Sequence, residues 1–170
     1  MNFDKWMNTN FAFYNGFELQ YLNVPRKIIA EEYLEDLEKV SDYRFMCFNG
    51  EVKMVWLDTY QTDHRCLTFF TPEWKKMNIK MRHPIAEYDI PRPKNYEKML
   101  TIASTLSQGF AHVRVDLYNV DGKIYFGELT FSSTSGTLGI EPKEFEYEMG
   151  DWIELPQKQS TPRTILGLAK

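Results

Sequence analysis

Several short stretches of the chain alternate hydrophobic and polar residues with the period of two that is typical of β-strands. Two of them, residues 42–48 and 51–58, flank Asn49-Gly50, and we predict that they form a β-hairpin. Asn-Gly is the dipeptide best suited to the two positive-φ positions of a tight turn. This hairpin is the clearest element that the sequence predicts.

A second hairpin is predicted around Val120-Asp121-Gly122. Its strands are residues 112–119 and 123–131, which alternate in the same way. Glycine suits the left-handed position at the end of a three-residue loop, and a loop of that length pairs Asn119 with Lys123. We therefore expect the loop to contain three residues.

The loop length decides which side chains of this hairpin share a face, because faces alternate along each strand. In the three-residue register Arg114 lies opposite Glu128, and one face collects four polar side chains, those of Arg114, Asp116, Glu128 and Thr130. The other face is expected to be core, with Val113, Val115, Leu117, Tyr125, Leu129 and Phe131. A two-residue turn would instead separate Asp116 from Glu128.

The remaining elements follow from weaker signals. Residues 27–34 are predicted to form a strand after Pro25, because the residue before a proline favours an extended backbone. A helix is predicted over residues 95–107, where an asparagine can cap the first turn and Gly109 ends the apolar spacing. The proline-rich stretch 59–93 is predicted to be loop.

Together these elements predict an α+β fold with a mostly antiparallel sheet and packed helices. We divide the chain into an aromatic-rich N-terminal segment (residues 1–25), a folded domain (26–156) and a C-terminal tail (157–170) that we expect to be mobile. A chain of 170 residues is long enough to bury about 70% of its unfolded surface.

The composition excludes several classes of protein. With 43% hydrophobic and 15% aromatic residues, the chain is not disordered. Its net charge of −4 offers no basic surface for nucleic acid. No run of about 18 apolar residues predicts a transmembrane segment. Two cysteines without a disulfide spacing pattern, and no secretory leader, predict a reduced, cytoplasmic protein.

Two carboxylates on one face of the second hairpin, Asp116 and Glu128, suggest a cation site. Two such groups repel each other unless a cation lies between them, and oxygen ligands suit Mg²⁺ held together with substrate phosphates. Arg114 beside them can bind phosphate oxygens through two hydrogen bonds. A solvated strand face with an Arg–Glu cross-strand pair, worth about 0.2–1 kcal/mol, explains the same residues. The residues alone leave both interpretations open.

The strings at residues 114–118 (RVDLY) and 122–131 (GKIYFGELTF) resemble the C-terminal metal hairpin of the ATP-grasp superfamily. More narrowly, the chain is similar to the TupA-like ATP-grasp family, which is associated with teichuronopeptide and other cell-surface polysaccharide biosynthesis. The likeness runs in order from about Arg26 to Pro156, through residues 28–34, 42–50, 95–107 and 149–156. It implies the C-terminal portion of an ATP-grasp fold.

The resemblance also implies ATP and Mg²⁺ as cofactors. It makes Asp116 and Glu128 ligands of one or two Mg²⁺ ions that bridge the phosphates. Thr130 takes the position where the superfamily usually has an asparagine ligand, and its hydroxyl is shorter and weaker. Arg114 becomes the catalytic residue that stabilises charge on the transferred phosphoryl group.

A nucleotide site is implied further upstream. By the resemblance, four residues face the adenine and Asp42 binds the ribose hydroxyls; the four are Glu31, Glu32, Tyr33 and Leu34. From the residues alone, Glu31-Glu32 equally suits the charged end of an edge strand.

One departure from the family divides the functional hypotheses. ATP-grasp enzymes have an N-terminal domain and a glycine-rich flap with phosphate-contacting lysines before the adenine segment, whereas only Gly16 and Lys5 precede Arg26 here. The first hypothesis is a ligase that activates a carboxylate or saccharide-linked acceptor as an acyl phosphate. Self-association or a partner subunit would then supply the missing N-terminal half. The second is a non-catalytic remnant that binds nucleotide weakly or acts as an interaction subunit.

Two loop segments carry groups that suit an anion. Arg65, with His64 beside it, lies in the irregular stretch and can contact a phosphate or an acceptor, although charges in loops are more often solvated. Residues 132–139 offer hydroxyls and backbone donors that can cover phosphates, or form a flexible connection.

Overall fold

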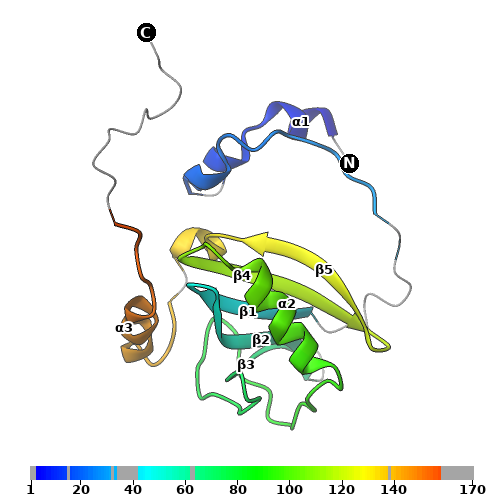
Figure 1. Cartoon of the computed structure of the whole chain (residues 1–170), viewed down its shortest axis with the longest axis vertical. Helices are drawn as coiled ribbons and strands as arrows, with labels where there is room; N and C mark the ends of the chain where they lie inside the picture. The colour runs from blue at the N-terminus through cyan, green and yellow to red at the C-terminus, as the bar shows by residue number, and fades with distance from the viewer. Residues whose placement is uncertain are drawn as a thin grey trace.

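A computed structural model describes residues 3–14, 16–31, 33, 42–61, 64–137 and 139–157 of the chain. Its five strands form one antiparallel sheet in the order β3-β2-β1-β4-β5; they are β1 (Asp42–Phe48), β2 (Glu51–Gln61), β3 (His64–Phe70), β4 (His112–Val120) and β5 (Lys123–Thr130). The helices are α1 (Phe3–Asn8), α2 (Tyr96–Leu106) and α3 (Glu144–Asp151). In Figure 1, α2 crosses one face of the sheet, and the N-terminal segment with α1 lies beyond the β5 edge. The predicted α+β fold with a mostly antiparallel sheet is confirmed.

Helix α2 covers the larger of two hydrophobic clusters. Its Tyr96, Met99 and Ala103 are buried, with the spacing of three and four residues that places them on one helix face. They pack on apolar residues of the central strands, and the ring of Phe45 in β1 stacks on Tyr96 with centroids 6.1 Å apart. The predicted helix is therefore confirmed as Tyr96–Leu106, and its apolar stripe fixes one face of the sheet. The predicted cap is wrong, because the Asn95 side chain makes no capping hydrogen bond and instead donates to the carbonyl of Gly122 at 2.8 Å.

Helix α3 packs against part of the opposite face. Its buried Phe145 belongs to a second cluster with Phe48, Trp56 and Phe69 of the sheet. Trp152, just after the helix, packs edge-on against Phe48 with ring centroids 5.2 Å apart. The sequence did not predict this helix, because its acidic residues leave only a narrow apolar stripe. Of the tail expected to be mobile (157–170), residues 158–170 lie outside the described residues.

The first hairpin has the predicted turn. Asn49 (φ 51°) and Gly50 (φ 84°) both adopt positive φ, and Phe48 pairs with Glu51 across them. One irregularity was not predicted. Cys47 pairs with Val52 while Met46 pairs with Met54, so Lys53 is an extra, bulged residue of β2.

The strand predicted at residues 27–34 is not present in the described part of that range. Residues 27–31 and 33 have no regular secondary structure. Ile28 and Ile29 are 56% and 75% exposed, respectively. Adjacent isoleucines point to opposite sides of an extended chain, so this segment has no single apolar face to place on the sheet. The strand prediction is wrong for the described residues.

The stretch 59–93 contains more structure than predicted. Strand β2 continues to Gln61, and β3 (His64–Phe70) is buried from Cys66 onward. Its apolar residues run nearly without interruption because both sides of the strand are covered, so the alternation used to recognise strands is absent. Residues 71–77 are irregular, as predicted, apart from an isolated bridge between Phe70 and Lys76.

The helices in the described part of the chain are short. None of them combines the length and the apolar character needed to cross a membrane.

Both cysteines are free, and their burial predicts that their thiols react slowly in the native chain. Cys47 and Cys66 are 0% and 2% exposed, and burial raises the pKa of the Cys47 thiol to about 11. Because the thiolate is the reactive form, we expect neither thiol of the native chain to react with Ellman's reagent at pH 8, and both to react in urea. Cys66→Ser isolates Cys47. A rapid reaction of the native Cys66→Ser variant would contradict the burial of Cys47.

Candidate functional site

The second hairpin turns through two residues, not three. Asp121 (φ 50°) and Gly122 (φ 85°) form the turn, and Val120 pairs with Lys123. The predicted three-residue loop and its Asn119–Lys123 pair are therefore wrong. Both turn residues adopt positive φ, which is the geometry that matches the natural twist of a two-residue hairpin.

A β-bulge nevertheless keeps the predicted charged face together. Val115 pairs with Leu129 and Leu117 pairs with Phe126, so two residues of β5, Gly127 and Glu128, lie opposite Asp116 alone. The shorter turn shifts the register of β5 by one residue, which would move each of its side chains to the other face of the sheet. The extra residue of the bulge shifts the register by one more, so the side chains return to the predicted faces.

Only the residues of β5 that follow the bulge are returned to their predicted faces. Between the turn and the bulge, Tyr125 pairs with Tyr118 and so shares the face of Asp116. Its predicted place in the core is therefore wrong. The residues of β5 that follow the bulge keep the predicted faces, but the predicted pairing of Arg114 with Glu128 is wrong: Thr130 lies opposite Arg114.

Arg114 lies between the two carboxylates. Its Nε and Nη2 donate to Oδ1 and Oδ2 of Asp116, both at 2.7 Å, and Nη2 also donates to Oε1 of Glu128 at 2.6 Å. The Thr130 hydroxyl donates to the same Glu128 oxygen at 2.8 Å, and Arg114 Nη1 donates to Ser133 at 3.0 Å. The structure thus brings together all four residues predicted on this face.

Burial makes this cluster electrostatically unusual. Arg114 and Asp116 are 9% and 4% exposed, whereas the Glu128 side chain is 63% exposed. Burial raises the pKa of Asp116 to about 6, although the hydrogen bonds from Arg114 favour its ionised form. For Arg114, burial acts to lower the pKa, but the neighbouring carboxylates outweigh it and the pKa is raised. Arg114 therefore stays cationic, and Glu128 is the carboxylate that solvent reaches.

The cluster continues across the sheet as a chain of ion pairs that the sequence did not predict. Arg44 of β1 lies 3.7 Å from Asp116 and also pairs with Asp42 and with Asp58 of β2. Asp58 in turn accepts from Arg65 of β3 at 2.9 Å. Charges thus alternate in sign from β3 to β5. The bulge at residue 53 contributes, because it places Arg44 opposite Trp56 and hence on the same face as Asp58.

The predicted adenine and ribose residues do not form one group in the structure. Asp42 joins the charged face: Arg44 Nε donates to its Oδ2 at 2.9 Å, whereas its buried Oδ1 accepts no hydrogen bond among the described residues. Burial raises the pKa of Asp42. Glu31 and Tyr33 are exposed, and neither forms a hydrogen bond or an ion pair with the charged face in the described part of the chain. Glu32 and Leu34 lie outside the described residues.

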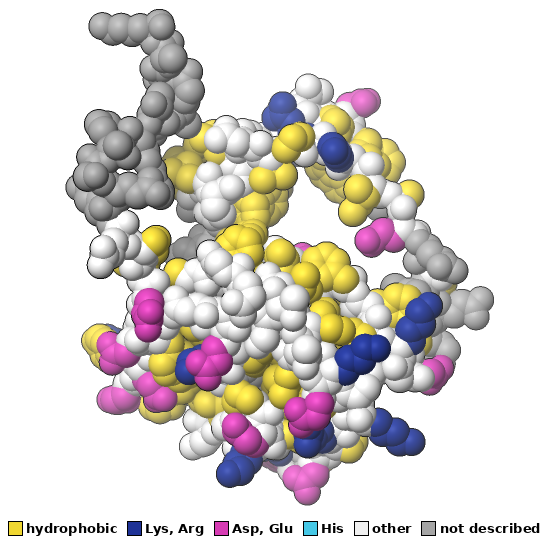
Figure 2. Space-filling view, in the orientation of Figure 1, with side chains coloured by type: hydrophobic (Ala, Val, Ile, Leu, Met, Phe, Trp, Pro, Cys, Tyr) yellow, Lys and Arg dark blue, Asp and Glu magenta, His cyan; other side chains and the backbone are white. Residues whose placement is uncertain are grey.

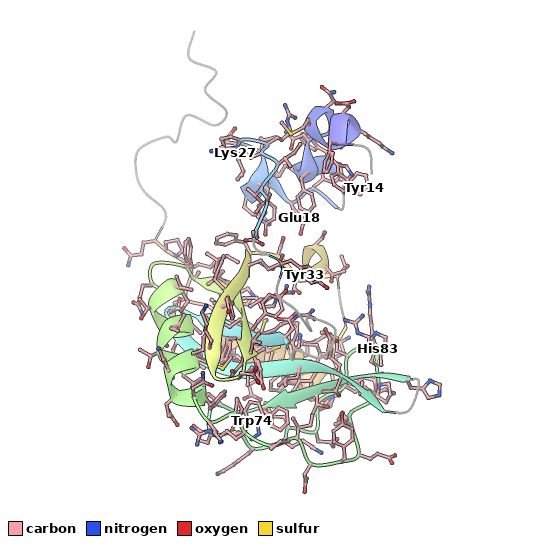
Figure 3. The ribbon with its side chains drawn as sticks, turned by 90° about the vertical axis from the view of Figure 1, so that its right-hand side faces the viewer. Tyr14, Glu18, Lys27, Tyr33, Trp74 and His83 are labelled. Carbon is pink, nitrogen blue, oxygen red and sulfur yellow. The ribbon has the colours of Figure 1, made fainter. Side chains whose placement is uncertain are left out.

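A cavity of about 800 Å³ opens beside Glu128 and Thr130. One wall is β5 and the following turn η4 (Ser133–Gly136), and the other is the N-terminal segment with its short turns η1 (Phe11–Phe13) and η2 (Leu19–Tyr21). Figure 3 shows Glu18 on the side of this segment nearer the sheet and Tyr14 farther away.

Hydrogen bonds hold the N-terminal wall in place. Ser132 Oγ donates to Glu18 at 2.9 Å, and the backbone N–H of Phe131 donates to the Tyr21 hydroxyl at 3.0 Å. Figure 2 shows the apolar side chains of the N-terminal segment gathered at the top of the molecule. No local sequence pattern predicts this arrangement, because the residues that meet are about 110 positions apart.

The oxygen donors fit Mg²⁺ by their chemistry. Asp116, Glu128 and Thr130 offer carboxylate and hydroxyl oxygens, the hard ligands that Mg²⁺ prefers when it is also bound to phosphates. In the described part of the chain, no three acidic, histidine or cysteine side chains converge on one point. A metal held here would therefore take few protein ligands and depend on phosphate oxygens for the rest.

Comparison with known proteins gives one match. A protein-family model described as TupA-like ATPgrasp matches residues 1–154, and so includes the aromatic-rich N-terminal segment. Neither a curated protein nor a solved structure matches the chain.

Gly127 gives a test of the bulge. A Cβ at this position would lie 3.0 Å from the backbone oxygen of Asp116 and 3.2 Å from the Tyr118 ring. We expect Gly127→Ala to lower the free energy of unfolding by about 1–3 kcal/mol, the usual penalty for overpacking, as measured by urea denaturation. Gly150→Ala is the matched control, because nothing lies within 4 Å of its added Cβ. Equal stability of the two variants would argue against a tightly packed bulge.

Proposed function

Because the chain belongs to the TupA-like ATP-grasp family, we propose that it is an ATP- and Mg²⁺-dependent ligase of cell-surface polysaccharide biosynthesis. The family supports ATP-grasp ligase-type chemistry in general. The proposed reaction has two steps. An acceptor carboxylate oxygen attacks the γ-phosphorus of ATP and releases ADP. A nucleophile such as an amine then attacks the acyl carbon and releases phosphate.

The Arg114 cluster is the observation that carries this proposal. A guanidinium fixed by two hydrogen bonds to Asp116 is already oriented, and it does not have to reorganise as charge develops on a phosphoryl group. Arg114 and its partner Glu128 both line the large cavity, so the oriented guanidinium lies at the edge of that cavity. We assign Arg114 the role of stabilising the transferred phosphoryl group.

Asp116, Glu128 and Thr130 are the proposed Mg²⁺ ligands. The metal, when bound, would neutralise charge on the nucleotide phosphates. Of these proposed ligands, Glu128 and Thr130 line the large cavity, and the Thr130 hydroxyl, which donates to Glu128 at 2.8 Å, orients that carboxylate.

The remaining nucleotide contacts are proposed from the family resemblance. Asp42 would bind the ribose, and this role is supported by its Oδ1, an acceptor without a donor among the described residues. A ribose hydroxyl could donate a hydrogen bond to this oxygen. Residues 31–34 would face the adenine. A second copy or a partner subunit that completes the nucleotide site remains a prediction of the resemblance.

A second candidate function is a nucleotide-binding or interaction subunit without catalysis. One observation favours it: Arg114 forms ion pairs with both Asp116 and Glu128, and Arg44 lies 3.7 Å from Asp116, so these carboxylates have cationic partners without a metal ion. The two candidates differ in whether Mg²⁺ strengthens nucleotide binding through Glu128.

Calorimetric titration with ATP tests this proposal. We expect saturable binding that requires Mg²⁺ and that weakens at least about tenfold in Glu128→Gln, because even the outer partners of metal ligands cost about 10- to 100-fold when removed. The substitution keeps an oxygen for Arg114, so the fold should be retained.

Glu51→Gln is the matched control. Glu51 is also an exposed glutamate, paired with Lys53 at 2.7 Å on the far hairpin. Its loss should leave ATP binding unchanged. Binding that is indifferent to Mg²⁺ and to Glu128→Gln would contradict the metal site, and no binding by the folded chain would favour the interaction subunit.

A further inference from the structure

A second, smaller cavity lies on the same face of the sheet as the charged chain. Its volume is about 140 Å³, and besides Trp56, Leu67, Met81 and His83 it is lined by six polar residues: Arg44, Arg65, Arg82, Arg114, Ser133 and Thr134. No carboxylate is part of this lining. Figure 3 shows His83 on the side of the sheet away from α2, which agrees with this position.

The polar part of the lining therefore consists of hydrogen-bond donors and positive charge. The acidic partners of Arg44, Arg65 and Arg114 are Asp42, Asp58, Asp116 and Glu128, which lie in the ion-pair chain outside the lining. Arg82 is exposed and forms no ion pair with a described residue. Guanidinium groups match the geometry of carboxylate and phosphate oxygens, so a pocket of this composition selects an oxyanion.

A buried donor without a partner supports the same conclusion. Trp56 is 3% exposed and lines the small cavity, and its indole Nε1–H has no acceptor among the described residues. Nearly all buried polar groups in proteins are paired, so such a donor indicates an acceptor that belongs to a ligand or to water. The guanidinium carbon of Arg114 lies 5.7 Å from the centroid of the Trp56 ring, so Trp56 lies beside the ion pairs of Arg114.

Two segments of the lining are held in an uncommon backbone conformation. Arg82 has φ 56°, and the N–H of His83 donates to the carbonyl of Met81 at 2.6 Å, which closes a three-residue turn around it. Thr134 and Ser135 have φ 49° and 55°. Non-glycine residues rarely adopt positive φ, and such positions concentrate at functional sites. Both segments thus present their side chains from strained turns.

The small cavity adjoins the large one. Arg114, Ser133 and Thr134 line both, so an anion in the small cavity would lie next to the proposed phosphate end of the nucleotide. We propose that the small cavity is an oxyanion site for the acceptor, which holds a carboxylate or phosphate group of the acceptor beside the reacting phosphoryl group. This inference rests on the proposed function for the identity of the ligand, but not for the binding of an anion.

Titration of the full chain with small anions, without nucleotide or Mg²⁺, tests this inference. The probes are succinate and inorganic phosphate, with uncharged succinamide as the reference, at constant ionic strength. We expect the anions to bind and succinamide not to bind. Stronger binding of succinate would assign the site to a carboxylate, and stronger binding of phosphate to a phosphate group.

Arg82→Gln and Arg65→Gln should each weaken anion binding about 10- to 100-fold, the usual effect of losing a hydrogen bond from a charged donor. Arg82 forms no ion pair with a described residue, so its substitution should leave the unfolding midpoint unchanged. Lys98→Gln removes an equal charge from an exposed position on α2, on the opposite face of the sheet, and should leave the anion affinity unchanged.

The outcomes separate this inference from the proposed function. Glu128→Gln should keep its affinity for the anion and bind Mg²⁺-ATP more weakly. Arg82→Gln should bind the anion more weakly and keep its affinity for Mg²⁺-ATP. No anion binding, equal binding by all variants, or competition between the anion and Mg²⁺-ATP would overturn the acceptor site. Anion binding in a chain that binds no ATP would overturn the nucleotide proposal alone.

Discussion

The charged face depends on one interaction, the guanidinium of Arg114 held between Asp116 and Glu128. Asp116 and Arg114 are both nearly buried, and a buried charge without a partner would destabilise the fold by several kcal/mol. Each is therefore acceptable only because the other is present. Glu128 takes part from β5, so the same guanidinium also ties the edge strand to β4. Removal of Arg114 would leave two carboxylates facing each other and Asp116 in a low-dielectric surrounding.

Two β-bulges bring the partners of this interaction to one face. The bulge at Gly127 and Glu128 sets the parity of β5, and the bulge at Lys53 sets the parity of β2. Without the bulge at Lys53, Asp58 would lie on the face of the sheet that α2 covers, among the apolar residues packed on that helix. The sheet face is thus divided along its length. One end carries the apolar residues that pack on α3, and the other carries the ion pairs and both cavities.

Sequence patterns predicted this division only in part. The Asn49-Gly50 hairpin and the helix at 95–107 were predictable because each has a local signal, a turn dipeptide or an apolar stripe with helical spacing. Arg114, Asp116, Glu128 and Thr130 were placed on one face correctly, but through two errors that cancel: the turn is one residue shorter, and the bulge adds one residue. The roles of Arg44 and Asp58 were missed because they depend on the Lys53 bulge, for which no residue gives a signal. Strand β3 was missed because it is covered on both sides.

The shared position of Arg114 links the two cavities. Its Nη2 contacts Glu128 at the large cavity, whereas its guanidinium lies over Trp56 at the small one. A ligand that alters the charge around Glu128 therefore alters how much of the positive charge of Arg114 is available to an anion on the other side. By linkage the effect is reciprocal, so an anion in the small cavity changes the affinity of the large one by the same factor. In the proposed function, this one buried arginine would position a phosphoryl group and respond to the charge of an acceptor next to it.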